Sequence, residues 1–266
     1  MPALNSAPQV SSQPYRSLAS SEAGKRVSEE VYWKDYYEHP DFNYEWNNGV
    51  LEEVPMADYL SFQLYRWFFR LLEEYLTMFP QSQLIGLEIG FALKMGTRKS
   101  IRKPDLALIA PGNARHMDNE ERSFKGTFDL CIEFLSDSTR QEIERDTIVK
   151  KAEYELVGVK EYFILDRLGQ HTAFYRLNEQ EHYQSITPKR GVIQSQVLDG
   201  FAFRLQDLET MPPFETLMDL SVYQPFLMKN LQQERAEKEQ ERTEKERLRA
   251  LLQKAGIDPD TRSRGS

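Results

Sequence analysis

The sequence has a single cysteine, Cys131, so no disulfide can form within the chain. It also lacks an apolar run of about 18 residues, which a membrane helix needs, and its first residues lack the apolar segment of a secretory signal. Acidic residues outnumber basic ones by 42 to 34, which is not typical of a general polyanion-binding protein. These absences favour a cytoplasmic protein with a buried, inert thiol.

Several catalytic signatures are missing as well. The histidines are scattered, and no two of them have the spacing of a zinc site; they are His39, His116, His171 and His182. The chain has no Walker loop, no dinucleotide-binding glycine run and no GxSxG elbow. The candidate chemistry described below needs neither cysteine nor histidine.

Composition divides the chain into three segments. Residues 1–27 are rich in Ser, Ala, Pro and Gln and are predicted to be a disordered leader. Residues 28–225 carry the apolar patterns of one folded domain, and residues 226–266 form a tail of charged residues and glutamine. The tail is predicted to be helical, with favourable pairs at Glu234–Lys238 and Glu241–Lys245. Its sparse leucines leave two interpretations open, a solvated single helix or a partner-binding helix of the coiled-coil kind.

The central segment alternates between helical and strand patterns. An aromatic stretch begins with a short helix and turns at Asn47-Asn48-Gly49, and apolar residues in steps of three and four predict a long helix from Asp58 to Phe79. A second helix is predicted over 139–157, ending at Gly158. Apolar runs predict strands at 50–54, 87–93, 105–110, 128–135, 161–166, 172–177, 182–187 and 192–204. This order predicts an α/β (α+β) domain, a mixed sheet flanked by helices.

Two carboxylates interrupt the apolar strands. Asp105 opens the strand at 105–110, and Glu133 stands inside the strand at 128–135 between apolar neighbours. A carboxylate is costly to bury unless a partner, a hydrogen bond or a metal compensates it. Each residue therefore has two interpretations, a structural one at a strand edge or a role in binding.

The second helix brings a further polar stripe. Asp146, Lys150 and Tyr154 recur every four residues and so share one side of the helix. Either this stripe is a solvated face with an ion pair of little worth, or its lysine belongs beside the strand carboxylates. An opposite stripe is expected to pack on the core; it consists of Ile148, Ala152 and Leu156.

Two carboxylates and a lysine suit one kind of chemistry. Mg²⁺ binds through one or two carboxylates and completes its shell with water and phosphate, and it can activate water for phosphodiester hydrolysis. The segment 94–103, predicted to be a loop, holds five basic residues and no acidic one. It suits a nucleic-acid backbone through Arg98, Lys99, Arg102 and Lys103, although an ordinary solvated loop fits equally well.

At these residues the chain resembles known nucleases. Pro104-Asp105 before a strand, with Glu133 in a second strand, resembles the PD-(D/E)xK nuclease superfamily. The stretch IEFLSDSTRQEIERDTIVKKAEYELVGVKEYFILD is similar to the signature of the Uma2 family (DUF820) of restriction-type endonucleases, and NYEWNNGVLEEVPM is similar to that family's upstream segment. The signature positions are Glu133, Ser136, Ser138, Thr139, Asp146, Lys150, Tyr154, Gly158, Val159, Glu161, Tyr162, Phe163 and Asp166. The resemblance covers about residues 28–210 and implies a restriction-endonuclease-like fold.

The resemblance also implies roles for single residues. Asp105 and Glu133 correspond to the metal-binding acids, with Mg²⁺ or Mn²⁺ as the cofactor and DNA as the substrate. The superfamily's lysine position, two residues after the second acid, is Leu135 here, and Lys150 matches the helix-borne lysine of the family. Glu45, Asp146 and Tyr154 correspond to supporting positions. Two features depart from the family pattern: the segment before Asp146 is longer than usual, and Asp58 and Ser61 stand where a histidine is frequent.

The sequence therefore predicts a metal-dependent endonuclease, with a homodimer expected by analogy alone. The alternative is a catalytically silent protein of the same fold that binds a partner or nucleic acid through its tail helix. The acidity of the chain favours this alternative, whereas the set of two acids and a lysine favours the enzyme.

Overall fold

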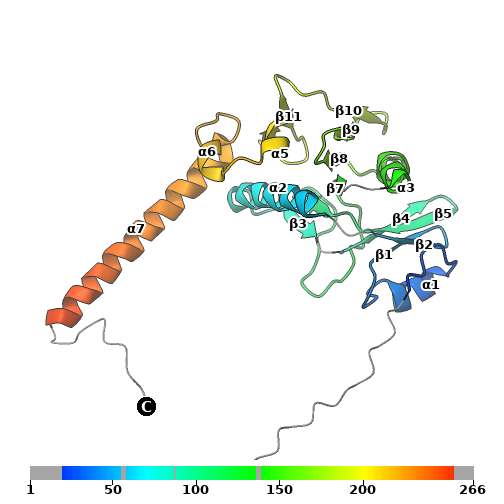
Figure 1. Cartoon of the computed structure of the whole chain (residues 1–266), viewed down its shortest axis with the longest axis horizontal. Helices are drawn as coiled ribbons and strands as arrows, with labels where there is room; N and C mark the ends of the chain where they lie inside the picture. The colour runs from blue at the N-terminus through cyan, green and yellow to red at the C-terminus, as the bar shows by residue number, and fades with distance from the viewer. Residues whose placement is uncertain (1–19, 55–57, 87, 136–138, 255–266) are drawn as a thin grey trace, which may run out of the picture. The chain divides into compact units, whose positions relative to one another are not determined.

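The computed structural model describes residues 20–54, 58–86, 88–135 and 139–254, and of residues 228–239 and 253 it describes only the backbone. The chain divides into two compact units, Met1–Pro55 and Met56–Ser266. Figure 1 shows the elements of both. No helix in the described parts of the chain is long and apolar enough to cross a membrane.

The first unit contains a short helix and a hairpin. Its elements are α1 (Glu29–Val31), the π-helical η1 (Tyr32–Tyr36), β1 (Tyr44–Asn47) and β2 (Val50–Glu53). Strands β1 and β2 pair antiparallel around Asn48 and Gly49, whose φ angles of 47° and 100° suit a tight hairpin turn. This confirms the predicted turn.

The leader prediction needs a correction at its end. The backbone N–H of Gly24 donates to Leu51 O, and that of Val27 donates to Gly49 O, each at 2.8 Å. Residues 24–27 therefore belong to the fold, because their amides satisfy carbonyls of the hairpin. Residues 1–19 of the predicted leader lie outside the described residues.

The second unit is built on a six-stranded sheet in the order β10-β9-β8-β7-β6-β3. These strands are β3 (Gln83–Gly86), β6 (Leu106–Ile109), β7 (Leu130–Leu135), β8 (Glu161–Asp166), β9 (Ala173–Leu177) and β10 (Tyr183–Ser185). Strands β7 and β8 are parallel, and the remaining pairs are antiparallel. The sheet is thus mixed, as the sequence predicts, with two further hairpins formed by β4 (Phe91–Met95) with β5 (Arg98–Arg102) and β11 (Val192–Gln194) with β12 (Ala202–Arg204).

Helices cover both faces of this sheet. Helix α2 (Tyr59–Met78) begins at Asp58, whose side chain accepts hydrogen bonds from the amides of Leu60 and Ser61. The connection from β7 to β8 is the helical run α3 (Arg140–Glu144), η2 (Arg145–Lys150) and α4 (Lys151–Leu156). In Figure 1, α2 and α3 lie on opposite sides of β7 and β8. The remaining helices are α5 (Asp207–Thr210), α6 (Phe214–Leu217) and α7 (Gln224–Lys254).

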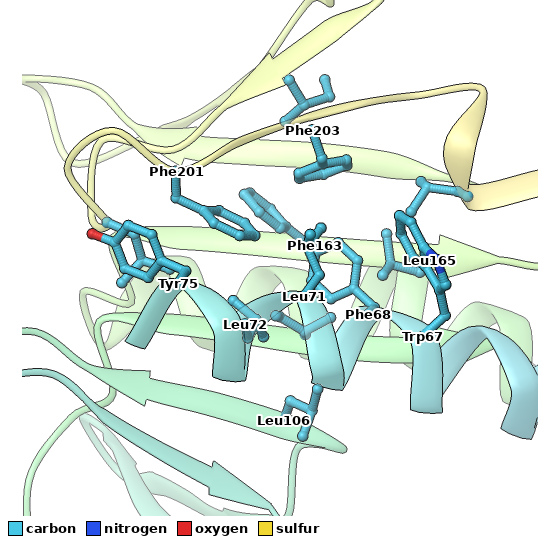
Figure 2. Close-up of a cluster of buried hydrophobic side chains, with 14 of the residues drawn as sticks. Trp67, Phe68, Leu71, Leu72, Tyr75, Leu106, Phe163, Leu165, Phe201 and Phe203 are labelled. Atoms are coloured by element: carbon cyan, nitrogen blue, oxygen red, sulfur yellow. The ribbon is translucent and has the colours of Figure 1, made fainter. Parts of the chain in front are cut away.

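Alternate strand residues point to two separate cores, as the pleat requires. The core under α2 takes Leu106, Leu108, Leu130, Ile132, Phe163 and Leu165 from the sheet. Figure 2 shows Phe68, Leu71 and Leu72 of α2 packed in this core. The core under α4 takes Ala107, Ile109, Cys131, Leu135, Tyr162 and Ile164. By the same alternation, Asp105 and Glu133 belong to the face that α4 covers.

Two sequence predictions before β6 are wrong. The strand predicted at 87–93 is β4 and begins only at Phe91, while β3 was not predicted. The segment 94–103, predicted to be a loop, holds most of β5, which pairs with β4 around a turn at Gly96 (φ 63°). Its charged residues obscured the strand pattern, because Ile101 is the one apolar residue of β5. Pairing with β4 and a buried ion pair help to stabilise this strand.

The tail helix is anchored to the second unit. Phe226 and Leu227 at its start are fully buried in the core under α2, and the rings of Phe226 and Tyr75 meet edge to face at a centroid distance of 5.8 Å. At the other end Leu248, Leu251 and Leu252 are exposed. The first turn of the predicted tail is thus part of the folded unit.

Candidate active site

The two predicted metal ligands stand on neighbouring strands. Leu106 pairs with Ile132 and Ala107 with Cys131, so continuing the register by one residue places Asp105 opposite Glu133. Directly opposed residues have Cβ atoms about 4.5–5.5 Å apart. The amide of Phe134 donates a 2.7 Å hydrogen bond to Asp105 Oδ2, which fixes this carboxylate at the end of β7.

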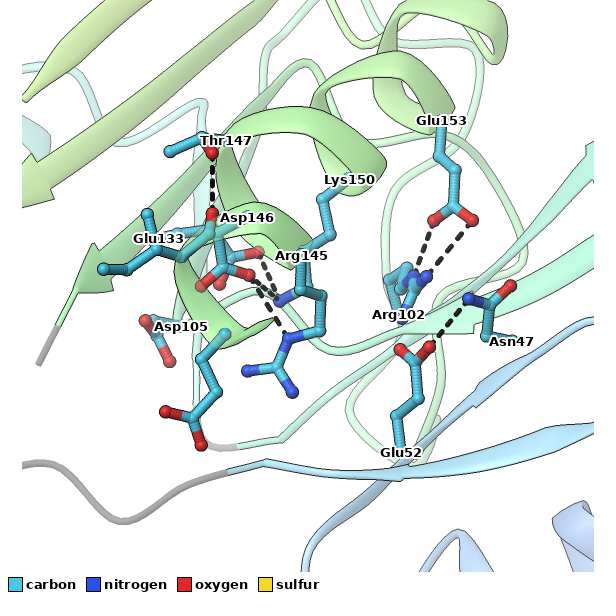
Figure 3. Close-up of polar contacts among 12 residues, drawn as sticks. Asn47, Glu52, Arg102, Asp105, Glu133, Arg145, Asp146, Thr147, Lys150 and Glu153 are labelled. Carbon is cyan, nitrogen blue, oxygen red and sulfur yellow. Dashed lines mark hydrogen bonds and ion pairs between the residues drawn. The ribbon is translucent and has the colours of Figure 1, made fainter. Parts of the chain in front are cut away.

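Lys150 reaches Glu133 from the crossover helix. Its Nζ lies 3.0 Å from Glu133 Oε1 and 3.2 Å from Asp146 Oδ1, as the dashed lines in Figure 3 show. The hydroxyl of Tyr154 donates to the same Glu133 Oε1 at 3.0 Å. The structure therefore brings together four of the residues that the sequence singles out, with Asp105 on the adjacent strand.

The orientation of this helix contradicts one sequence prediction. The polar stripe faces the sheet, with Asp146, Lys150 and Tyr154 all buried, whereas Ile148 and Leu156 are 61% and 72% exposed. The predicted core stripe is therefore on the outside. The physical reason is that Glu133 needs a cation and a hydrogen-bond donor, since a buried carboxylate left alone costs several kcal/mol, roughly 3–5. The π-helical η2 spans Arg145–Lys150, and such segments are frequent at functional sites.

The surroundings of Glu133 are of low polarity. Burial raises the pKa of the Cys131 thiol well above its usual range, and the charge of Glu133 raises it further. Burial likewise raises the pKa of Tyr162, and the charges of Glu133 and Asp146 raise it further. The Tyr162 hydroxyl donates to the backbone oxygen of Asp146 at 2.9 Å, which holds the start of η2 on the sheet. Cys131 is thus a neutral core residue beside the site.

Two residues near the acids were not found by the sequence reasoning. The ring of Tyr65 on α2 meets Phe134 edge to face at 5.2 Å; burial raises its pKa, and the charge of Asp105 adds to the shift. Arg145 Nε lies 3.5 Å from Asp146 Oδ1, with its side chain mostly buried. The one sequence signal for Arg145 was its position directly before Asp146. The sequence held no signal for Tyr65, because the contacts of Tyr65 depend on the tertiary fold.

The basic residues of β5 fall into two groups. Arg102 is fully buried, and its Nε lies 2.6 Å from Glu153 Oε2 in a buried ion pair. Lys103 is also buried, whereas Arg98 is exposed and Lys99 is partly exposed. Arg102 and Lys103 are therefore not placed where a nucleic-acid backbone could reach them. Glu153 also accepts a hydrogen bond from Ser100. It therefore has a structural role, since it joins the inner side of the helix to β5.

The remaining residues that the resemblance names belong to other elements. Glu45 stands in β1 of the first unit. Asp166 closes the turn after β8, because its carboxylate accepts hydrogen bonds from the amides of Leu168 and His171. Ser136 and Ser138 of the family signature lie outside the described residues.

The donor set indicates which metal could bind. No group of three or more His, Cys, Asp or Glu side chains in the described parts of the chain has the arrangement of a metal site. The opposed carboxylates Asp105 and Glu133 do fit Mg²⁺, which is held by one or two carboxylates and otherwise by water and phosphate.

Comparison with known proteins bears on the fold and the family of the chain. The chain is similar to a crystal structure described as "a putative nuclease belonging to DUF820" from Anabaena variabilis ATCC 29413, with a TM-score of 0.53 and 14% identity, over 70% of this chain and 98% of that one. At this identity the similarity shows the fold alone, and it confirms the predicted fold class. No curated protein matches the chain. The model of the Uma2 family, described as "Putative restriction endonuclease", matches residues 30–208. The chain belongs to the Uma2 family.

Proposed function

We propose that this protein is a Mg²⁺-dependent endonuclease that hydrolyses phosphodiester bonds in DNA. The observation that carries the proposal is the convergence of Asp105, Glu133 and Lys150 at the end of β7. Family membership supports a nuclease, and the opposed carboxylates support the metal.

Asp105 and Glu133 would hold the ion, with Mn²⁺ as a substitute. When bound there, the ion supplies a lowered pKa for a coordinated water and a positive charge for the scissile phosphate. Asp105 is fixed for this task by the Phe134 amide, and Glu133 is oriented by the hydroxyl of Tyr154.

Lys150 would act on the water or the phosphate. Its ammonium lies 3.0 Å from Glu133 Oε1, so a water held beside that carboxylate comes within reach of an ammonium hydrogen. Donation from Lys150 would orient the attacking oxygen or stabilise negative charge that develops on the phosphate oxygens. Asp146 keeps Lys150 aimed at Glu133 through the 3.2 Å ion pair and is a positioning residue.

The phosphate backbone would meet Arg98 and Lys99. Both lie on β5, and Arg98 is exposed. Each phosphate contact releases counterions, so binding should weaken as salt rises. Arg102 and Lys103 are left out of this contact because they are buried.

The test is cleavage of supercoiled DNA with Mg²⁺, with Mn²⁺ and with a chelator. The parent should cleave only with metal, and Glu133→Gln should lose at least about a hundredfold in rate, because removing a group that acts in the transition state costs several kcal/mol. Glu144→Gln is the matched control, an exposed acid on the same helical run. Full activity of Glu133→Gln would refute the assignment.

A second candidate is a non-catalytic interaction protein that uses α7. The exposed Leu248, Leu251 and Leu252 favour it, because they share one side of the helix at steps of three and four. They would bind a second copy or another protein. Deletion of 228–266 should then change the number of chains per particle, as measured by light scattering, and an unchanged number would exclude dimerisation through the tail.

A further inference from the structure

The first turn of α2 exposes aromatic side chains. Tyr59 is 71% exposed and Phe62 is 46% exposed, and their spacing of three residues places them on one side of the helix. We call this pair the aromatic platform. Arg66, one turn beyond Phe62, is exposed as well. Exposed apolar residues that occur singly need no explanation, but adjacent ones that are followed by a cation indicate a binding surface.

The platform is continuous with the candidate active site. Ser61, between Tyr59 and Phe62, donates from Oγ to Leu135 O at 3.2 Å, at the end of β7. Leu135 is two residues beyond Glu133, which is about 7 Å along a strand. One turn further along α2, Tyr65 packs on Phe134, whose amide holds Asp105. The inner side of this helix end therefore contacts the strands that carry the acids, while the platform points outward.

We propose that Tyr59 and Phe62 stack on unpaired bases of the nucleic acid whose backbone enters the candidate active site. Aromatic rings beside a cation are the usual means of binding single-stranded nucleic acid, because every base has a flat face and every nucleotide a negative charge. Arg66 supplies the cation. Paired bases in a duplex do not offer their faces to a helix surface. The substrate class is thus DNA with unpaired bases near the scissile phosphate. The inference that DNA with unpaired bases is cleaved rests on the proposed function. The inference that the aromatic platform binds such DNA does not.

The test is binding of fluorescent oligonucleotides, measured by anisotropy with a chelator so that no cleavage occurs. The probes are a thymidine 20-mer, the same strand with abasic sites at every position, and a duplex. The double variant Tyr59→Ala/Phe62→Ala should bind the thymidine strand about tenfold or more weakly, since stacking contributes about 1–3 kcal/mol per base. Binding of the abasic strand and of the duplex should not change.

Three further variants make the test specific. Leu156→Ala removes from another helix a side chain that is 72% exposed, close to the 71% of Tyr59, and should leave DNA binding unchanged. Tyr59→Phe/Phe62→Tyr keeps two rings and should bind as the parent does. Arg66→Ala should reduce the slope of log affinity against log salt by about 0.7, the value for one phosphate contact on a single strand.

Each outcome decides a separate point. Equal affinity of the parent and the double alanine variant for the thymidine strand overturns the inference, as does absence of any binding by the parent. Loss of self-association in the double variant, with unchanged DNA binding, also overturns it and assigns the platform to a second copy of the chain. Base-dependent binding without cleavage in Mg²⁺ would support the platform and contradict the proposed endonuclease.

Discussion

Lys150 Nζ lies 3.0 Å from Glu133 Oε1, and both side chains are almost completely buried. One residue stands on β7 and the other on the helical crossover that follows it. A buried ion pair contributes little to stability when compared with an apolar pair, but removing one partner leaves an uncompensated charge. The contact therefore makes folding and the proposed chemistry depend on the same two residues.

Replacing Lys150 by methionine should destabilise the protein strongly. Glu133 and Asp146 would then share a buried site without their ammonium, and the free energy of unfolding should fall by about 3–5 kcal/mol. Denaturant unfolding at neutral pH measures this. Lys151→Met is the control; its ammonium lies 4.3 Å from the Tyr175 ring centroid, which is worth about 0.5–1 kcal/mol. Adding Glu133→Gln to Lys150→Met should recover part of the loss, and equal effects of the two lysine variants would contradict the assignment.

Arg102 should behave as a structural residue. Arg102→Met leaves Glu153 buried without its cation and should cost about 3–5 kcal/mol, while Arg98→Met on the same strand should stay within about 0.5 kcal/mol. In DNA binding the order should reverse, because the exposed Arg98 can contact phosphate. Salt-dependent affinity of both variants, measured well below their melting temperatures, provides the check. If Arg102→Met stays folded and it, but not Arg98→Met, shows a smaller slope of log affinity against log salt, then Arg102 contacts the nucleic-acid backbone as the sequence predicts.

Stability should fall at alkaline pH through Cys131. Burial raises the pKa of its thiol, whereas an unfolded cysteine ionises near pH 8.5, an approximate reference value. Above that pH the unfolded chain binds fewer protons than the folded one, so the free energy of unfolding falls by about 1.4 kcal/mol per pH unit. Below the pKa of the unfolded thiol, the contribution of Cys131 to the free energy of unfolding is fully present. Between pH 7.5 and 9.5 the free energy of unfolding of the parent should fall by about 1.4 kcal/mol more than that of Cys131→Ala. Equal falls in the two proteins would refute this prediction.

Tyr65 should support Asp105 through its ring. Tyr65→Phe keeps the contact with Phe134 and should preserve both stability and metal affinity. Tyr65→Ala should cost about 1–3 kcal/mol and weaken Mn²⁺ binding, because Phe134 would no longer hold its amide firmly on Asp105. Calorimetric titration compares the two variants. If phenylalanine weakens binding as much as alanine does, the hydroxyl rather than the ring is what matters.

Local patterns were sufficient for most of the sheet and for α2. Asp58 and Pro80 delimit α2 in the sequence, and the structure has it at Tyr59–Met78 with Asp58 as its cap. The apolar run on both sides of Glu133 was enough to place this residue inside a strand, which is β7. Such features depend on neighbours within a few residues, and these are visible in one sequence.

The errors share one physical cause. Periodicity shows that Asp146, Lys150 and Tyr154 lie on one stripe, but it does not show which stripe faces the sheet. Apolarity favoured Ile148 and Leu156, yet the buried charge of Glu133 decided the orientation. In the same way Arg102 was assigned to a basic loop, either solvated or in contact with a nucleic-acid backbone, because its partner Glu153 lies 51 residues away. Buried ion pairs between distant residues override local hydropathy.

The most direct test of the central claim is calorimetric titration of Mn²⁺ into the parent and into Asp105→Asn. Both are mixed with a DNA strand that resists cleavage, so that phosphate can complete the metal's shell. The parent should bind the ion, and Asp105→Asn should bind it at least about tenfold more weakly, since a carboxylate ligand becomes a neutral amide. Equal binding by both proteins, or no binding by the parent, would contradict a metal site at Asp105 and Glu133.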